Sequence, residues 1–61
     1  MMHEKHLNWA TGHDWGRNAF LKEGKIFVPN DGSKTHEPYA IVRGAWLEFS
    51  SFENLYWWAG Y

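Results

Sequence analysis

The amino-acid sequence predicts a small α+β domain in which short helices pack on an antiparallel sheet of two or three strands. Three observations support this class. The chain has 61 residues, enough for one domain at most, so we treat residues 1–61 as a single unit and expect residues 1–5 to be flexible. Apolar residues recur at helical spacing in the first third of the chain, and short β-branched or aromatic runs bounded by glycine and proline follow. The chain has no cysteine, so an apolar core and not disulfides must stabilise it.

Two short helices are predicted before the first strand. The first covers residues 3–10 and ends near Gly12, a helix-breaking residue. The second covers residues 15–23. Asp14 is a suitable N-cap for this second helix, and Gly24 suits the position just after its last turn.

Two strands are predicted in the middle of the chain. Residues 25–28 are short, apolar and β-branched, and residues 29–33 have the composition of a turn. The loop continues to Pro38, and residues 39–43 form the second strand. Residues 25–28 are its simplest partner, which gives a hairpin with a long polar tip.

Gly44 interrupts the next apolar stretch. It is either a bulge in one long strand or part of a tight turn before a third strand over residues 45–49. Alternation along that strand separates two sets of side chains, Ala45, Leu47 and Phe49 on one face and Trp46 and Glu48 on the other.

The last segment begins with the pattern of a capping box, in which Ser50 is the N-cap and Glu53 the third helical residue. A helix from this point would place one apolar stripe toward the core: Phe52, Leu55, Tyr56 and Ala59. The alternative is a strand through residues 55–59, because aromatic residues favour strands.

Composition argues against several classes of function. The formal net charge is −1, which is not the charge of a general polyanion-binding protein. There is no cysteine nucleophile, no nucleophile elbow and no phosphate-binding glycine loop, so we predict a protein that is not an enzyme and uses no cofactor. The chain shows no signal-peptide pattern and no apolar run of about 20 residues, so we expect a soluble, cytoplasmic protein without membrane contact.

Histidines near the start of the chain raise the question of a metal site. His3 and His6 are three residues apart, a spacing that places two ligands on one helix face, and His13 and Asp14 follow nearby. We interpret them as solvated side chains near a chain end and predict no metal.

A DNA-binding alternative comes from residues 20–29, with the sequence FLKEGKIFVP. This segment resembles the helix end and first strand of small winged-helix excisionases and related regulators. The resemblance implies that a second helix enters the major groove and that a wing contacts phosphates. Carried onto this chain, the resemblance implies that Arg17, Asn18 and Lys22 are nucleic-acid-binding residues on the helix. It implies the same role on the wing for Lys34 and His36.

The distribution of aromatic residues gives the leading functional hypothesis. Seven of the twelve aromatic residues lie in residues 46–61, and one helix or strand cannot direct all of them to one core. Exposed aromatic area often marks an interaction site. We therefore predict a protein-binding surface formed by Trp46, Trp57, Trp58 and Tyr61.

The predicted function is that of a small regulator or inhibitor, of the kind that phages and mobile elements encode, which docks on a larger protein. One alternative is a homo-oligomer with the aromatic segment as its interface. Another is that these residues form only the core. The amino-acid sequence is compatible with all three of these possibilities.

Overall fold

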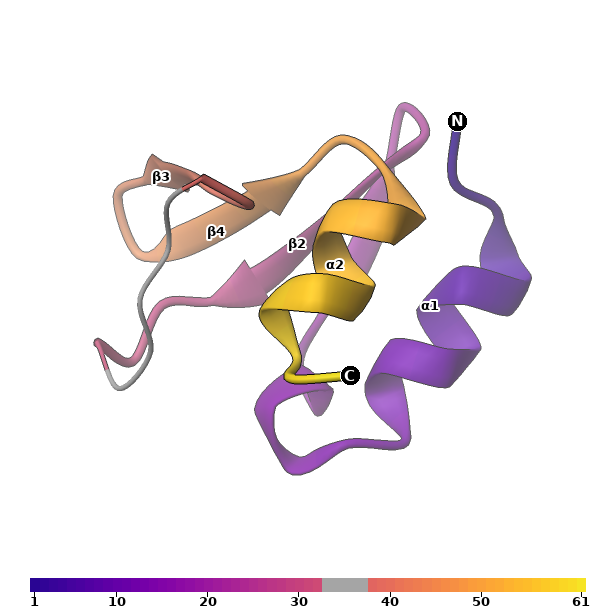
Figure 1. Cartoon of the computed structure of the whole chain (residues 1–61), viewed down its shortest axis with the longest axis horizontal. Helices are drawn as coiled ribbons and strands as arrows, with labels where there is room; N and C mark the ends of the chain where they lie inside the picture. The colour runs from indigo at the N-terminus through magenta and orange to yellow at the C-terminus, as the bar shows by residue number, and fades with distance from the viewer. Residues whose placement is uncertain (33–37) are drawn as a thin grey trace.

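The computed structural model describes residues 1–32 and 38–61, and this part of the chain forms an α+β domain (Figure 1). In chain order the elements are helix α1 (Glu4–Thr11), the 3-10 helix η1 (Asp14–Gly16), strands β1 (Phe20–Lys22), β2 (Lys25–Pro29), β3 (Ile41–Arg43) and β4 (Trp46–Phe49), and helix α2 (Phe52–Trp58). The predicted α+β class is confirmed, with a sheet of four strands where two or three were expected.

All neighbouring strands in the sheet are antiparallel, and the strand order is β1-β2-β4-β3. One two-residue turn joins β1 to β2 and another joins β3 to β4, so the sheet consists of two hairpins that meet at the β2–β4 pair. Residues 39–43 were expected to pair with residues 25–28, and this pairing is wrong because β4 lies between them. Leu47 and Phe49 of β4 are fully buried opposite Val28 and Ile26, whereas all three β3 residues are exposed, so apolar burial favours β4 in the centre.

The predicted helix over residues 15–23 is absent. Only η1 forms a helical turn there, with His13 and not Asp14 in the N-cap position, and the chain then enters β1. Glu23 and Gly24 both have positive φ, 53° and 76°, which is the geometry of a two-residue hairpin turn and not of a helix end. This turn places β1 beside β2, and that pairing replaces the helix.

The other predicted elements are close to those observed. The helix expected over residues 3–10 is α1, and the helix expected after residue 50 is α2, which excludes the strand alternative. The N-cap of α2 is Ser51 and not Ser50, because the Ser51 hydroxyl accepts a hydrogen bond of 3.2 Å from the Asn54 backbone N–H. Gly44 lies in the tight turn between β3 and β4, with φ of +61°, and is not a bulge.

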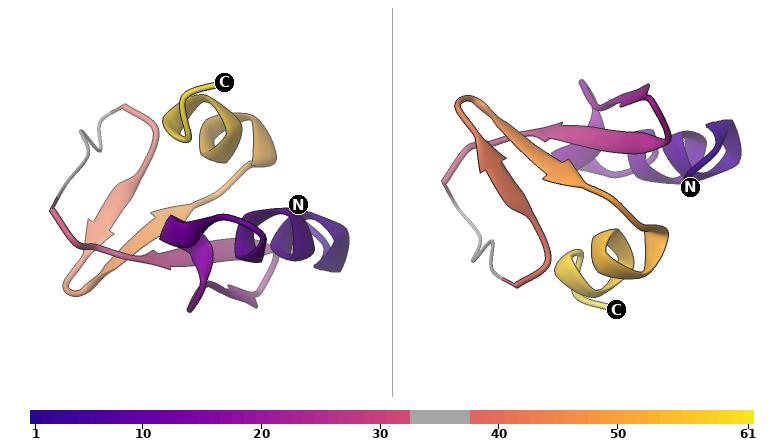
Figure 2. Two further views of the ribbon diagram at one scale, coloured as in Figure 1. Left: turned by 90° about the horizontal axis from the view of Figure 1, so that it is seen from below. Right: turned by 90° about the horizontal axis from the view of Figure 1, so that it is seen from above.

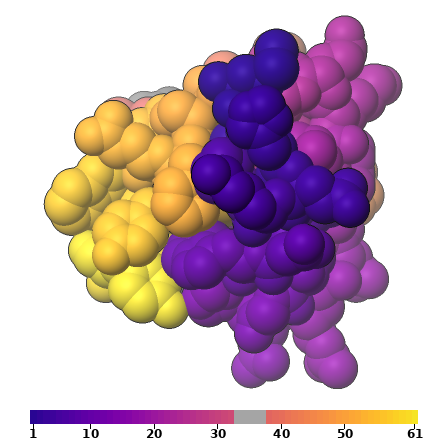
Figure 3. Space-filling view, turned by 90° about the vertical axis from the view of Figure 1, so that its right-hand side faces the viewer, coloured from indigo at the N-terminus to yellow at the C-terminus, as the bar shows by residue number. Residues whose placement is uncertain are grey.

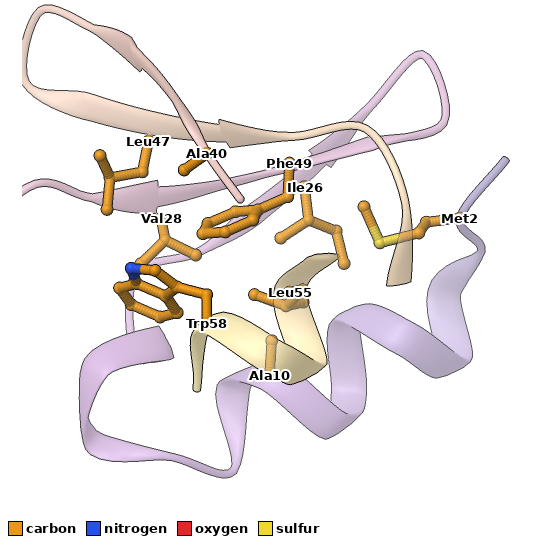
Figure 4. Packing of buried hydrophobic residues seen from close by; sticks show 9 residues of the cluster. All are labelled: Met2, Ala10, Ile26, Val28, Ala40, Leu47, Phe49, Leu55 and Trp58. Carbon is orange, nitrogen blue, oxygen red and sulfur yellow. The ribbon is translucent and has the colours of Figure 1, made fainter. Parts of the chain in front are cut away.

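The core lies between the sheet and the two helices (Figure 4). The sheet contributes Ile26, Val28, Leu47 and Phe49, and the helices contribute Ala10, Leu55 and Trp58. Met2 closes one end of this core with 2% exposure, and its backbone N–H donates to the Gly24 carbonyl at 2.9 Å. Met2 is therefore part of the core, and the expected flexibility of residues 1–5 stays a prediction.

A close approach between α1 and η1 depends on Gly16. A Cβ atom at this position would lie 2.7 Å from the carbonyl carbon of Ala10 and closer still to its oxygen. The His13 backbone N–H donates to the same Ala10 carbonyl at 3.0 Å. The missing side chain of Gly16 thus allows η1 to pack directly on the end of α1.

Candidate functional site

Exposed aromatic side chains gather where α2 meets α1. Tyr56, Trp57 and Tyr61 are 38%, 51% and 56% exposed, and we call these three residues the helix-side aromatic surface. Figure 3 shows the α2 segment, in orange and yellow, lying against the indigo and purple α1 segment on this side of the molecule. The surface is therefore formed by residues from the end of the chain supported by residues near its beginning.

Ring contacts hold two of these side chains in place. The Tyr56 and Tyr61 rings are stacked, with centroids 5.1 Å apart, and the half-buried Trp9 ring lies 5.9 Å from Tyr56 and 5.6 Å from Tyr61. Phe52 packs edge-on against Trp9 at 5.0 Å. Trp57 differs, because its one ring contact among the described residues is with Tyr56, at 6.1 Å.

His13 fixes the position of Tyr61. The Nδ1 atom of His13 lies 2.9 Å from the Trp9 carbonyl oxygen, and its Nε2 atom lies 2.8 Å from the Tyr61 hydroxyl. Because a carbonyl oxygen can only accept, Nδ1 of the neutral ring bears the proton, and Nε2 then accepts a hydrogen bond from the Tyr61 hydroxyl. The aromatic surface is thus attached to the end of α1 by a hydrogen bond as well as by ring packing.

The four residues predicted to form a protein-binding surface do not lie together. Trp57 and Tyr61 are on the helix-side aromatic surface, but Trp58 is only 7% exposed and belongs to the core, where its ring lies 5.1 Å from Phe49. The physical reason is helical spacing, since Trp58 follows the buried Leu55 by three residues and so shares its inward face. Trp46 lies on the opposite side of the sheet.

Two contributors to this surface, Tyr56 and Trp9, were not predicted from the sequence. Tyr56 was expected on the inward stripe of its helix and is instead exposed. Trp9 supports the surface from α1, and the repeat of apolar residues in its helix gave no indication that it would meet residues about fifty positions later. Only the tertiary contact reveals its role.

The face of the sheet that points away from the core forms a second aromatic surface. In Figure 2, α1 is in front of β2 in the view from below and behind it in the view from above, and Figure 4 shows the inner side chains of the strands directed toward the helices. Alternate residues face the other way, and no described helix covers them. We call this set the outer sheet face: Phe20, Lys22, Lys25, Phe27, Pro29, Ile41, Arg43, Trp46 and Glu48.

Three aromatic rings form a cluster on the outer sheet face. The Phe20 and Phe27 rings are parallel within 9° and 4.9 Å apart, and Trp46 meets Phe20 edge-on at 4.9 Å. Phe20 is 37% exposed, whereas Phe27 and Trp46 are half-buried. The rings come from β1, β2 and β4, so the cluster spans three adjacent strands.

A buried carboxylate lies beside these rings. Glu48 is only 6% exposed, and its two oxygens meet Lys25 Nζ at 3.3 Å and Arg43 Nε at 3.0 Å. The hydrogen bond from Arg43, together with the ammonium of Lys25, lowers the pKa of Glu48 below that of an ordinary glutamate, although burial acts in the opposite direction. Glu48 therefore remains ionised and neutralises part of the charge of two cations.

The residues proposed for a winged helix do not form one. Arg17 and Asn18 lie in the turn between η1 and β1, and Lys22 is the last residue of β1. Lys34 and His36 lie outside the described residues. Since the helix that would enter the major groove is absent, the DNA-binding mode implied by the winged-helix resemblance has no structural basis in the described chain.

The histidines near the start of α1 are engaged in local contacts. The His3 backbone N–H donates to Nδ1 of His6 at 2.9 Å, and the His6 ring lies 4.7 Å from Phe52. Burial, followed by the nearby charge of Lys5, lowers the pKa of His6. Within residues 1–32 and 38–61, no cluster of three or more histidine or acidic side chains could hold a metal ion.

The described residues form no pocket, and none of their helices is both long and apolar enough to cross a membrane. No protein-family model, curated protein or solved structure matches this chain.

Proposed function

We propose that this chain is a small, non-enzymatic regulator or inhibitor that binds a larger protein through the helix-side aromatic surface. The observation that supports the proposal is the contiguous exposure of Tyr56, Trp57 and Tyr61. Tyrosine and tryptophan provide large contact areas at low entropic cost and dominate the binding energy of many interfaces. Ring stacking and the His13 hydrogen bond preorganise two of the three rings, which reduces the cost of ordering them on binding.

The charge around this surface indicates what the partner offers. Helix α2 has no lysine or arginine, and its exposed Glu53 lies three and four residues before Tyr56 and Trp57, on the same helix face. Asp14, beside His13, is also exposed. An apolar pocket bordered by lysine or arginine would complement this arrangement. We also propose a cytoplasmic location, because the chain has no cysteine, as is common in reducing compartments.

Trp57→Ala is the variant that tests the proposal most directly. Trp57 is half exposed and has one ring contact in the described structure, so its removal should leave the fold intact. If Trp57 is a binding hot spot, its loss should weaken partner affinity about thirtyfold, equivalent to about 2 kcal/mol. Phe20→Ala is the matched control, because Phe20 is an exposed aromatic residue that lies on the outer sheet face and not on the helix-side aromatic surface.

The experiment compares the proteins that the unmodified chain and both variants capture from a lysate of the organism that encodes it. The captured partner is then purified, and its affinity for each form is measured by calorimetry. A partner that binds the unmodified chain and Phe20→Ala equally, and Trp57→Ala weakly, supports the proposal. Equal binding by all three forms would refute it. Self-association that Trp57→Ala abolishes would show that the partner is a second copy of this chain.

A further inference from the structure

We propose that the outer sheet face binds single-stranded nucleic acid by stacking bases on its aromatic cluster. This binding mode differs from that of a winged helix and uses a different surface from the proposed protein-binding site. Aromatic rings and cations lie together on this one open sheet face, and the role of each can be tested separately.

The sign of the charge on this face is opposite to that of the chain as a whole. Three cations, Lys22, Lys25 and Arg43, lie on the outer sheet face, and Glu48 is its only described acidic residue. The chain as a whole has a net charge of −1. The negative charge is therefore located elsewhere, and the local potential on this face favours a phosphate backbone.

The cations flank the aromatic cluster at both ends. The sheet register pairs Lys22 with Lys25 in one row, Phe20 with Phe27 in the next, and Trp46 with Arg43 in the third. Rows of side chains on one face are two residues apart, which corresponds to about 7 Å. A flexible strand crossing the face could therefore place bases on the rings while its phosphates meet cations on either side.

The exposure of the cations is compatible with this role. The side chains of Lys25 and Arg43 remain 46% and 61% exposed although both contact Glu48. Each contacts the carboxylate through one nitrogen, and Arg43 uses Nε, which is not one of its two terminal nitrogens. Both cations are thus held beside the rings and remain accessible to phosphate oxygens.

The face suits a single strand better than a duplex or a basic protein surface. Bases in a duplex already stack on one another, whereas the unpaired bases of a single strand are free to stack on side chains. No described helix projects from this face to enter a groove. Two lysines opposite each other in the first row would also repel most basic protein surfaces, but a phosphate backbone neutralises both.

The test is fluorescence anisotropy of a labelled oligothymidylate of about 12 nucleotides, titrated at low and at moderate salt, with the corresponding duplex as a comparison. Three phosphate contacts predict a logarithmic salt slope of about −2 for a single strand. Phe20→Ala should reduce affinity at least about fivefold through lost stacking, and Lys22→Ala should reduce both the affinity and the salt slope.

Two kinds of variant make the result specific. Trp57→Ala and Lys5→Ala remove an exposed aromatic residue and an exposed lysine away from the outer sheet face, so they should leave binding unchanged. Glu48→Gln should strengthen binding and steepen the salt slope, because it removes the carboxylate that neutralises Lys25 and Arg43. Circular dichroism of each variant verifies that it is folded.

Several outcomes would overturn the proposal: no binding at low salt, equal affinity for duplex and single strand, or equal losses in Phe20→Ala and Trp57→Ala. Self-association that Phe20→Ala abolishes would identify the face as an interface between copies and would equally overturn it. Because Trp57 and Phe20 exchange their roles as test and control in the two proposals, one proposal can fail while the other stands.

Discussion

Replacing Gly16 by alanine should destabilise the domain, whereas the same replacement at Gly12 should not. The two glycines lie four residues apart, Gly12 just after α1 and Gly16 at the end of η1, and each change adds one methyl group. At Gly16 the new Cβ would lie 2.7 Å from the carbonyl carbon of Ala10, well inside van der Waals contact. At Gly12 the nearest atom is the Trp9 carbonyl oxygen at 3.5 Å, and the backbone is already right-handed helical, with φ of −76°.

The size of the destabilisation caused by Gly16→Ala follows from the contacts that the added methyl group disturbs. To accept the methyl group, η1 has to shift away from α1. This weakens the 3.0 Å hydrogen bond from His13 to Ala10 and the packing of Trp15 on Trp9 and Trp58. Overpacking of this kind costs about 1–3 kcal/mol. The total stability of a domain of this size is only about 3–9 kcal/mol. At Gly12 the loss of backbone freedom in the unfolded chain should stabilise the fold by about 0.4–1 kcal/mol.

Thermal unfolding followed by circular dichroism measures the difference. In a domain of this size each kcal/mol shifts Tm by about 4–8 °C. Gly16→Ala should therefore lower Tm by at least about 4 °C, while Gly12→Ala raises it slightly. If Gly16→Ala is as stable as Gly12→Ala, then η1 does not pack on the Ala10 carbonyl.

Two further predictions concern the cap of α2 and the buried carboxylate. Ser51→Ala should lower the free energy of unfolding by about 1 kcal/mol through loss of the helix cap, whereas Ser50→Ala should change it by less than about 0.5 kcal/mol. Urea unfolding of both variants measures this difference. Equal losses of stability would contradict the assignment of Ser51 as the cap. The pKa of Glu48 is lower in the folded chain than in the unfolded chain, so the unfolded chain binds a proton at this carboxylate more readily. The stabilisation from ionised Glu48 is therefore complete above the ordinary glutamate pKa of about 4.3. It is lost as the pH falls through the lower pKa of the folded chain. Glu48→Gln should therefore show a weaker loss of stability on acidification than the unmodified chain, and parallel pH profiles would show that the ion pairs with Lys25 and Arg43 contribute nothing.

Local patterns offered a strand over residues 45–49 and favoured a helix over a strand for the last segment, and β4 and α2 lie at these positions. Alternation along residues 45–49 placed Leu47 and Phe49 on one face of the strand, and the structure shows that both are fully buried. The serine-rich start of α2 identified the helix, although the cap was displaced by one residue. Such features depend on neighbouring residues, and this is why sequence reasoning can find them.

Features that depend on tertiary contacts were not predictable. The spacing of Trp15, Ala19 and Phe20 fits a helix, and the turn that excludes the helix uses Glu23 with a φ of +53°, a conformation that favours glycine or asparagine. Residues 23 and 24 therefore lack the sequence pattern that is typical of strong hairpin turns. Likewise, His13 and Tyr61 are 48 positions apart, and no local pattern indicates their hydrogen bond.

The strand order has a consequence for how the chain could be divided. Residues 1–32 contain α1, η1 and the β1–β2 hairpin, and residues 38–61 contain the β3–β4 hairpin and α2, so each part is one hairpin with helical structure beside it. The two parts meet along β2 and β4. The core exists only when Ile26 and Val28 of one part lie beside Phe49 and Leu47 of the other in the sheet. The domain is thus organised like a heterodimer whose two subunits share one chain. Two peptides cut between these parts would each lack a core and would fold only by combining, as in fragment complementation.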